Sequence, residues 1–164
     1  MLNLLLALAA TAAPAAPLDA NLQPLAFLAG SCWQGELPAG QGTDTHCFTP
    51  MLGGHFLRDR HRVMPGGYAG ETVYRWDPAA RRIAFDYYSS PGTLMPGTAA
   101  ADAQGLAFEF QVPAPDGRPM PMRATWHRDG ADAYLVTTQV QQGGAWQTLP
   151  GNPRFRRIGP APAE

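Results

Sequence analysis

The chain has 164 residues, of which 45% are hydrophobic, and its formal net charge at pH 7 is −1. This length corresponds to one domain with enough apolar residues to form a real core. The near-neutral charge excludes a nucleic-acid-binding protein, which needs a strongly basic face.

Residues 1–16 form an apolar run that ends in small residues, which is typical of a secretory signal peptide. The run is too short to cross a bilayer, which takes about 20 apolar residues. No Lys or Arg precedes it, although signal peptides usually begin with a positive charge. We predict a signal peptide over 1–16 and an exported protein, periplasmic or secreted, with no membrane span. A flexible lead over 17–23, one domain over 24–158 and a disordered tail over 159–164 complete the predicted organisation.

The stretch 25–36 reads LAFLAGSCWQGE and predicts how one end of the fold is closed. Gly30 allows a sharp bend between an apolar turn and the first strand. Trp33 follows at the start of that strand, where its large apolar ring can cover the floor of a small barrel.

Two cysteines, Cys32 and Cys47, flank a segment whose centre, 37–42, has the composition of a turn. A hairpin that closes there places the two sulfurs on neighbouring strands, opposite each other. In an oxidising compartment such a pair forms a disulfide, which is our prediction. Two free buried thiols are an alternative, and so is a metal site, although the pair lacks CxxC spacing.

From residue 43 onward the chain consists of short alternating runs that end in turn residues, with no helical stretch. Strands at a spacing of about ten residues predict an all-β fold, an up-and-down antiparallel β-barrel of nine or ten strands. The predicted strands are 32–36, 43–49, 54–64, 69–76, 82–89, 94–101, 106–112, 121–128, 133–141 and 146–149 with 154–158.

Alternation within these strands predicts aromatic-rich inner faces. A barrel of about eight strands is filled by side chains, whereas one of about ten leaves room for a ligand. The predicted inward residues are Thr72, Tyr74, Trp76, Ile83, Phe85, Tyr87, Leu106, Phe108, Phe110, Val112, Tyr134, Val136, Thr138 and Val140.

The strand 54–64 carries the most polar residues. Arg58, with Arg60 and Arg62, alternates with Asp59 and His61, so one set faces outward and the other inward. We expect the arginines outside; alternatively, one of them points inward and binds a ligand carboxylate. Asp59 and His61 share a face, either as a satisfied polar contact or as an acid–base couple.

The other histidines, His46, His55 and His127, are isolated. Because no HxH or HExxH array is present, we predict no metal site. Single-histidine haem ligation needs no motif. The chain also lacks a GxSxG motif and a phosphate-binding glycine loop, so no catalytic residue is assigned.

The opening FLAGSCWQGE, the run LGGHFL at 52–57, YAGE at 68–71 and the dipeptide WD at 76–77 together resemble calycin-like barrels, in particular the nitrobindin-like and DUF1579-like families. The resemblance covers about residues 22–158 and implies a closed antiparallel barrel that holds a small apolar ligand. Nitrobindin-like barrels carry haem on a His near the chain's end. The corresponding stretch 152–158 has no His here, and His127 is the only late substitute, so haem is not favoured.

We therefore expect a barrel, monomeric or weakly dimeric, that binds a small hydrophobic or amphipathic molecule. The alternatives are a haem-binding or enzymatic barrel that uses His61 or His127, and a packed barrel that acts through its surface as an envelope interaction protein. The expected ligand contacts are Arg58, His61, Tyr74, Phe85, Tyr87, Phe108, Phe110 and Tyr134.

Overall fold

The computed structural model describes residues 17–114 and 116–162. The predicted signal peptide, 1–16, lies outside the described residues. The described chain is made of antiparallel strands with three short 3₁₀ turns. The strands are β1 (Ser31–Glu36), β2 (Thr43–Met51), β3 (Phe56–Met64), β4 (Ala69–Asp77), β5 (Arg82–Ser89), β6 (Leu94–Ala101), β7 (Gly105–Pro113), β8 (Pro119–Arg128), β9 (Ala133–Gln142), β10 (Ala145–Thr148) and β11 (Arg154–Pro160), and the turns are η1 (Ala20–Leu25), η2 (Pro38–Gly40) and η3 (Leu52–Gly54).

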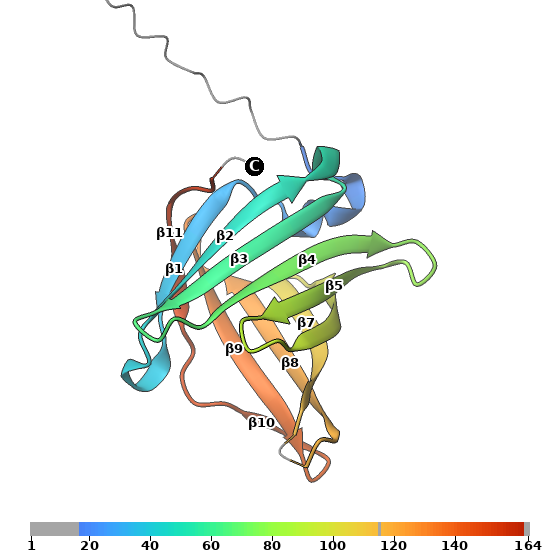
Figure 1. Cartoon of the computed structure of the whole chain (residues 1–164). Helices are drawn as coiled ribbons and strands as arrows, with labels where there is room; N and C mark the ends of the chain where they lie inside the picture. Colours follow the sequence, from blue (N-terminus) through green and yellow to red (C-terminus); the bar gives the residue numbers. More distant parts are fainter. Residues whose placement is uncertain (1–16, 115, 163–164) are drawn as a thin grey trace, which may run out of the picture.

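The strands close into a barrel, as Figure 1 shows. Each strand from β1 to β9 pairs with the next one along the chain, and β11 joins β9 to β1. β10 pairs with β9 outside this circle. The result is a closed barrel of ten strands with one additional outside strand, which confirms the predicted all-β fold. Closure pairs the backbone of the barrel strands on both sides.

The turn η1 closes the end of the barrel where the described chain begins (Figure 1). The Asp19 side chain caps η1 by accepting from the backbone of Asn21, and Leu22, Leu25 and Leu28 are fully buried. η1 lies against β4 and β7. Residues 17–23 therefore differ from the expected flexible lead, because apolar side chains at this end anchor them to the core.

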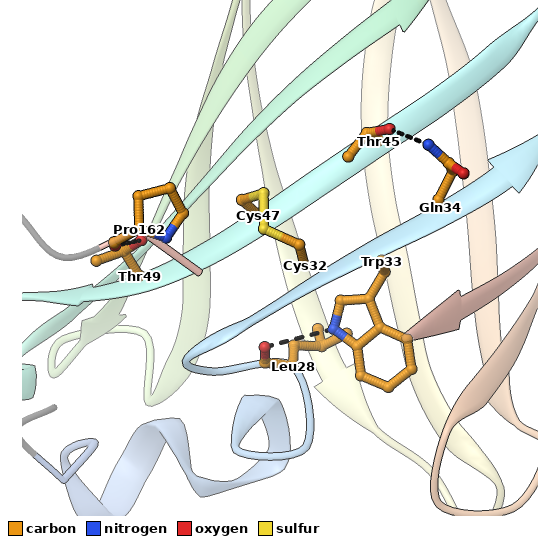
Figure 2. Close-up of a disulfide and its surroundings, with 8 residues drawn as sticks. All are labelled: Leu28, Cys32, Trp33, Gln34, Thr45, Cys47, Thr49 and Pro162. Carbon is orange, nitrogen blue, oxygen red and sulfur yellow. Dashed lines mark hydrogen bonds between the residues drawn. A yellow bond between two sulfur atoms is a disulfide. The ribbon is translucent and has the colours of Figure 1, made fainter. Parts of the chain in front are cut away.

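Trp33 covers the floor behind η1, as predicted. Its indole is fully buried and donates to the carbonyl of Leu28 at 3.5 Å (Figure 2). The guanidinium of Arg157 lies 4.4 Å from the centre of the Trp33 ring, and it also donates to the Ser31 hydroxyl. This cation–π contact ties the last strand of the barrel to the first.

The predicted disulfide is present. Cys32 and Cys47 are directly opposite in the pairing of β1 with β2, and their sulfurs are bonded (Figure 2). Trp33 and Cys32 are consecutive in an extended strand and point to opposite faces, so the bridge lies on the outside of the barrel.

The chain end beyond β11 also has specific contacts. Ser31 pairs with Pro160, Ala161 donates to the carbonyl of Gly30 at 2.9 Å, and Thr49 donates to the carbonyl of Pro162 at 3.5 Å. The tail expected to be disordered over 159–164 is thus attached to the barrel as far as 162, where the description ends. No helix in the described ranges combines the length and the hydrophobicity that crossing a membrane requires.

Candidate functional site

The interior of the barrel contains a cavity of about 360 Å³. Its volume lies within the range of small-molecule sites, about 300–1,000 Å³. The walls are mainly aromatic and aliphatic, with one polar side. The lining residues are His46, Asp59, His61, Thr72, Tyr74, Phe85, Tyr87, Met95, Phe108, Phe110, Ala124, Trp126, Val136 and Thr138.

Six of the predicted ligand contacts line this cavity, and they come from four strands. Phe85 and Phe108 meet edge to face with ring centres 6.1 Å apart, and Tyr74 packs against Phe85 at 5.7 Å. Period-two alternation was enough to find them because each strand has one inner face. These six are His61, Tyr74, Phe85, Tyr87, Phe108 and Phe110.

Arg58 does not line the cavity. It alternates with the inward Leu57 and Asp59, and with Arg60 and Arg62 it borders a groove on the outer face of β3. The expectation that the arginines face outward is confirmed, whereas the alternative of an inward Arg58 that binds a ligand carboxylate is wrong.

Tyr134 is inside the barrel but belongs to its packed part. Its ring is stacked between Trp126 at 5.1 Å and Phe155 at 5.1 Å, and it has no exposed surface. It therefore supports the cavity wall formed by Trp126 and does not itself line the cavity.

The polar side of the cavity is built by β2 and β3, which lie side by side (Figure 1). Asp44 and His46 are two residues apart on β2 and face inward together. Asp59 and His61 have the same relation on β3, and His61 is directly opposite His46. The two imidazole rings stack with centres 4.8 Å apart. Four titratable side chains thus meet on one inner surface.

Hydrogen bonds connect these four side chains into one continuous network. His46 Nδ1 is 2.8 Å from Oδ2 of Asp59, and His46 Nε2 is 3.1 Å from Oδ2 of Asp44. His61 Nδ1 is 3.0 Å from Oδ1 of Asp44. Asp59 therefore pairs with His46 across the two strands, and the Asp59–His61 couple considered from the sequence does not form. His61 takes Asp44 as its carboxylate partner instead.

This hydrogen-bond network continues toward the surface through two tyrosines. His61 Nε2 is 2.9 Å from the Tyr87 hydroxyl, which is 2.6 Å from the hydroxyl of the exposed Tyr68. Gly70 lies opposite His61 in the strand pairing. A Cβ at Gly70 would overlap both the Tyr87 hydroxyl and Nε2 of His61, so the missing side chain makes room for their contact.

The electrostatics of the cluster favour positive charge on His46. Burial alone would lower the pKa of His46, but the Asp59 and Asp44 carboxylates outweigh it and raise this pKa to about 10. Burial also opposes ionisation of Asp44, yet its hydrogen bonds with His46 and His61 hold the pKa of Asp44 well below its usual range. Burial and the Tyr68 hydroxyl raise the pKa of Tyr87.

One oxygen of the cluster has no hydrogen-bond partner among the described residues. Asp59 is only 2% exposed, and its Oδ2 is bound by His46, whereas its Oδ1 is unpaired. Asp59 lines the cavity. A buried carboxylate oxygen without a donor is costly, so this atom marks the place where a donor is missing.

Asp44 and His46 were missed as site residues. The signal that could have found them is their own alternation: Asp44 and His46 share a face of a strand that the predicted hairpin places near residue 61. The other histidines are elsewhere. His55 is an exposed residue 3.4 Å from Asp19, and His127 alternates with the inward-facing Trp126, so it does not line the cavity.

The residues on the cavity wall do not favour haem. His46 and His61 are the histidines on its wall within the described chain, and both ring nitrogens of each are already hydrogen-bonded. His127, the late substitute, faces the wrong way. A haem iron would have to displace one of these hydrogen bonds to gain an axial imidazole.

Comparison with models of protein families and with curated proteins finds no match for this chain.

Proposed function

We propose that the barrel binds a small amphipathic molecule whose polar end donates a hydrogen bond to Asp59. The observation that carries this proposal is the unpaired Oδ1 of Asp59, buried on the wall of an otherwise apolar cavity. An N–H or O–H group of a ligand would satisfy this oxygen.

The apolar walls of the cavity determine what the remainder of the ligand, beyond its polar end, should be. Phe85, Phe108 and Trp126 present large apolar surfaces, with the rings of Phe108 and Trp126 centred 4.7 Å apart. A flat ring system buries its surface against such walls at about 25 cal/mol per Å². The cavity volume of about 360 Å³ suits one or two fused rings with a single polar substituent.

We propose that the protein is exported and acts as a carrier or receptor for such a molecule. A disulfide such as Cys32–Cys47 persists in oxidising compartments and is rare in the cytosol. Together with the predicted signal peptide, it supports the proposal that the protein acts in the periplasm or outside the cell. The resemblance to nitrobindin-like and DUF1579-like barrels agrees with a ligand-holding interior.

The test uses two probes, 2-naphthol and 2-methoxynaphthalene, in which the O–H donor of the first is replaced by an O–CH₃ group in the second. A hydrogen bond to a charged group is worth about 1.5–3 kcal/mol, and about 1.4 kcal/mol is tenfold in affinity. We therefore expect calorimetric titration to show 2-naphthol binding at least about tenfold more tightly.

Asp59→Asn should abolish this preference, because the amide oxygen stays with His46 and the NH₂ group, a donor, takes the position of Oδ1. The matched control is Asp86→Asn on β5, a carboxylate that lies 3.9 Å from Arg75 and does not line the cavity. Equal binding of the two probes by the wild type, or a preference that survives in Asp59→Asn, would contradict the proposal.

A further inference from the structure

Three side chains of the ligand-forming types converge beside the cavity, at atoms that the proposed function does not use. One ligand atom each from Asp44, His46 and His61 lies within 4.8 Å of the others. Asp44 Oδ2 is 3.1 Å from His46 Nε2 and 3.3 Å from His61 Nδ1. Ligands that surround a tetrahedral Zn²⁺ at their usual bond lengths stand about 3.3 Å apart, so two of the three separations already match.

In each of the two imidazoles, the ring nitrogen that faces away from Asp44 is hydrogen-bonded to another side chain. An ionised carboxylate can only accept, so the bond from Asp59 to His46 places a proton on Nδ1 of His46. Nε2 of His46 faces Asp44 and, without a metal ion, donates its hydrogen bond to that carboxylate. The Tyr87 hydroxyl is hydrogen-bonded to Nε2 of His61, and Nδ1 of His61 faces Asp44.

Two imidazole nitrogens, one from His46 and one from His61, thus meet the same carboxylate of Asp44. A divalent metal ion would replace the protons of these hydrogen bonds, because imidazole and carboxylate bind a metal in their deprotonated forms. A carboxylate behind a metal-binding imidazole fixes its ring orientation and its tautomer, and it raises the basicity of the ligating nitrogen. Asp59 stands in that relation to His46.

The donor set indicates the class of cation. Two imidazoles and one carboxylate suit divalent transition metals, whereas Ca²⁺ and Mg²⁺ require mainly oxygen ligands. Three protein ligands with one open position are typical of a zinc site that takes an exogenous fourth ligand. His46 and His61 line the cavity and Asp44 does not, so the open position faces the cavity.

We propose that Asp44, His46 and His61 form a binding site for a divalent transition-metal ion, with Zn²⁺ as the expected ion. This proposal departs from the expectation, drawn from isolated histidines, that the chain has no metal site. Strand pairing supplies the array that the linear spacing lacks, because His61 comes from the strand opposite His46.

The test is a calorimetric titration of the chelator-stripped, full-length mature protein with ZnCl₂. We expect one ion per chain, and Asp44→Asn and His61→Gln should each weaken binding by about tenfold or more. The matched controls are His55→Gln, from an exposed Asp–His pair, and His127→Gln, from outside the cavity; both should bind Zn²⁺ like the wild type. Absence of stoichiometric binding, or binding that depends on His55, would overturn the proposal.

A second measurement uses the wild type alone, so it does not depend on whether the variants fold. Crystals of the wild type grown with ZnCl₂ should give an anomalous peak between Asp44, His46 and His61, and a peak elsewhere or no peak would refute the site. Titration of 2-naphthol with a chelator present separates the two proposals, because Asp59 Oδ1 is not one of the metal ligands.

Discussion

At Gly70 a missing side chain makes room for the contact between His61 and Tyr87. The Gly70→Ala variant places a methyl group against both polar atoms and should break their hydrogen bond. Overpacking of this kind costs about 1–3 kcal/mol in the free energy of unfolding. Urea denaturation followed by Trp fluorescence measures this loss.

Gly66→Ala is the matched control, because a Cβ at Gly66 meets no atom within 4 Å. It should leave the free energy of unfolding within about 0.5 kcal/mol of the wild type, as surface substitutions usually do. If Gly70→Ala were equally harmless, the description of Gly70 as the opening for the His61–Tyr87 contact would be incorrect.

The candidate site illustrates what the sequence could predict at the scale of single residues. The aromatic wall followed from alternation, because Phe85, Phe108 and Phe110 each occupy the inner face of a strand. The hydrogen-bond partners of Asp59 and His61 could not be predicted from the sequence pattern. These partners lie on β2, and the cross-strand register that selects them depends on the whole hairpin. Asp44 and His46 were missed for the same reason.

At the scale of elements, the hairpin of β1 and β2 is closed by the Cys32–Cys47 disulfide, which joins residues 15 apart in sequence. Closing a loop of this length stabilises a protein by about 3 kcal/mol in the chain-entropy model. The double variant Cys32→Ser, Cys47→Ser should lose about this much free energy of unfolding.

Because the bridge lies on the outer face, this double variant should retain the preference for 2-naphthol over 2-methoxynaphthalene. The intact mass of the alkylated wild type, with no reductant, should show no modified cysteine. Two alkylated cysteines in the folded wild type would show that the bridge is not formed.

The turn η1 is the other element with a clear energetic role. Leu25 is fully buried beneath the barrel, so Leu25→Ala should cost about 2–5 kcal/mol in the free energy of unfolding. Leu94→Ala on β6 is the matched control, since Leu94 is 56% exposed and should change stability by less than about 0.5 kcal/mol. Equal, small effects in both variants would contradict the packing of η1 against the barrel core.

Residues 17–23 show why the flexible lead was predicted and why the structure differs. The segment is rich in turn-forming and small residues, and its local pattern gives no strand or regular helix. What orders it is burial of Leu18 and Leu22 in the open end of a barrel, which is a long-range contact that no local pattern reveals. The barrel itself was predictable because every strand repeats the same alternation between similar turns.

At the scale of the whole molecule, a ring of ten strands both closes the sheet and leaves an interior larger than its side chains fill. One side of this interior concentrates the polar groups, and the remaining walls are apolar. Such a division orients an amphipathic molecule, with its donor toward Asp59 and its rings toward Phe108 and Trp126.

The most direct test of this account is native mass spectrometry of the mature protein purified from the cells that produce it, side by side with Asp59→Asn and Asp86→Asn. The account predicts that the wild type and Asp86→Asn retain a small organic molecule that carries an N–H or O–H group, and that Asp59→Asn releases it. A bare polypeptide in all three samples, or the same bound mass in all three, would contradict the assignment of Asp59 as the ligand's anchor.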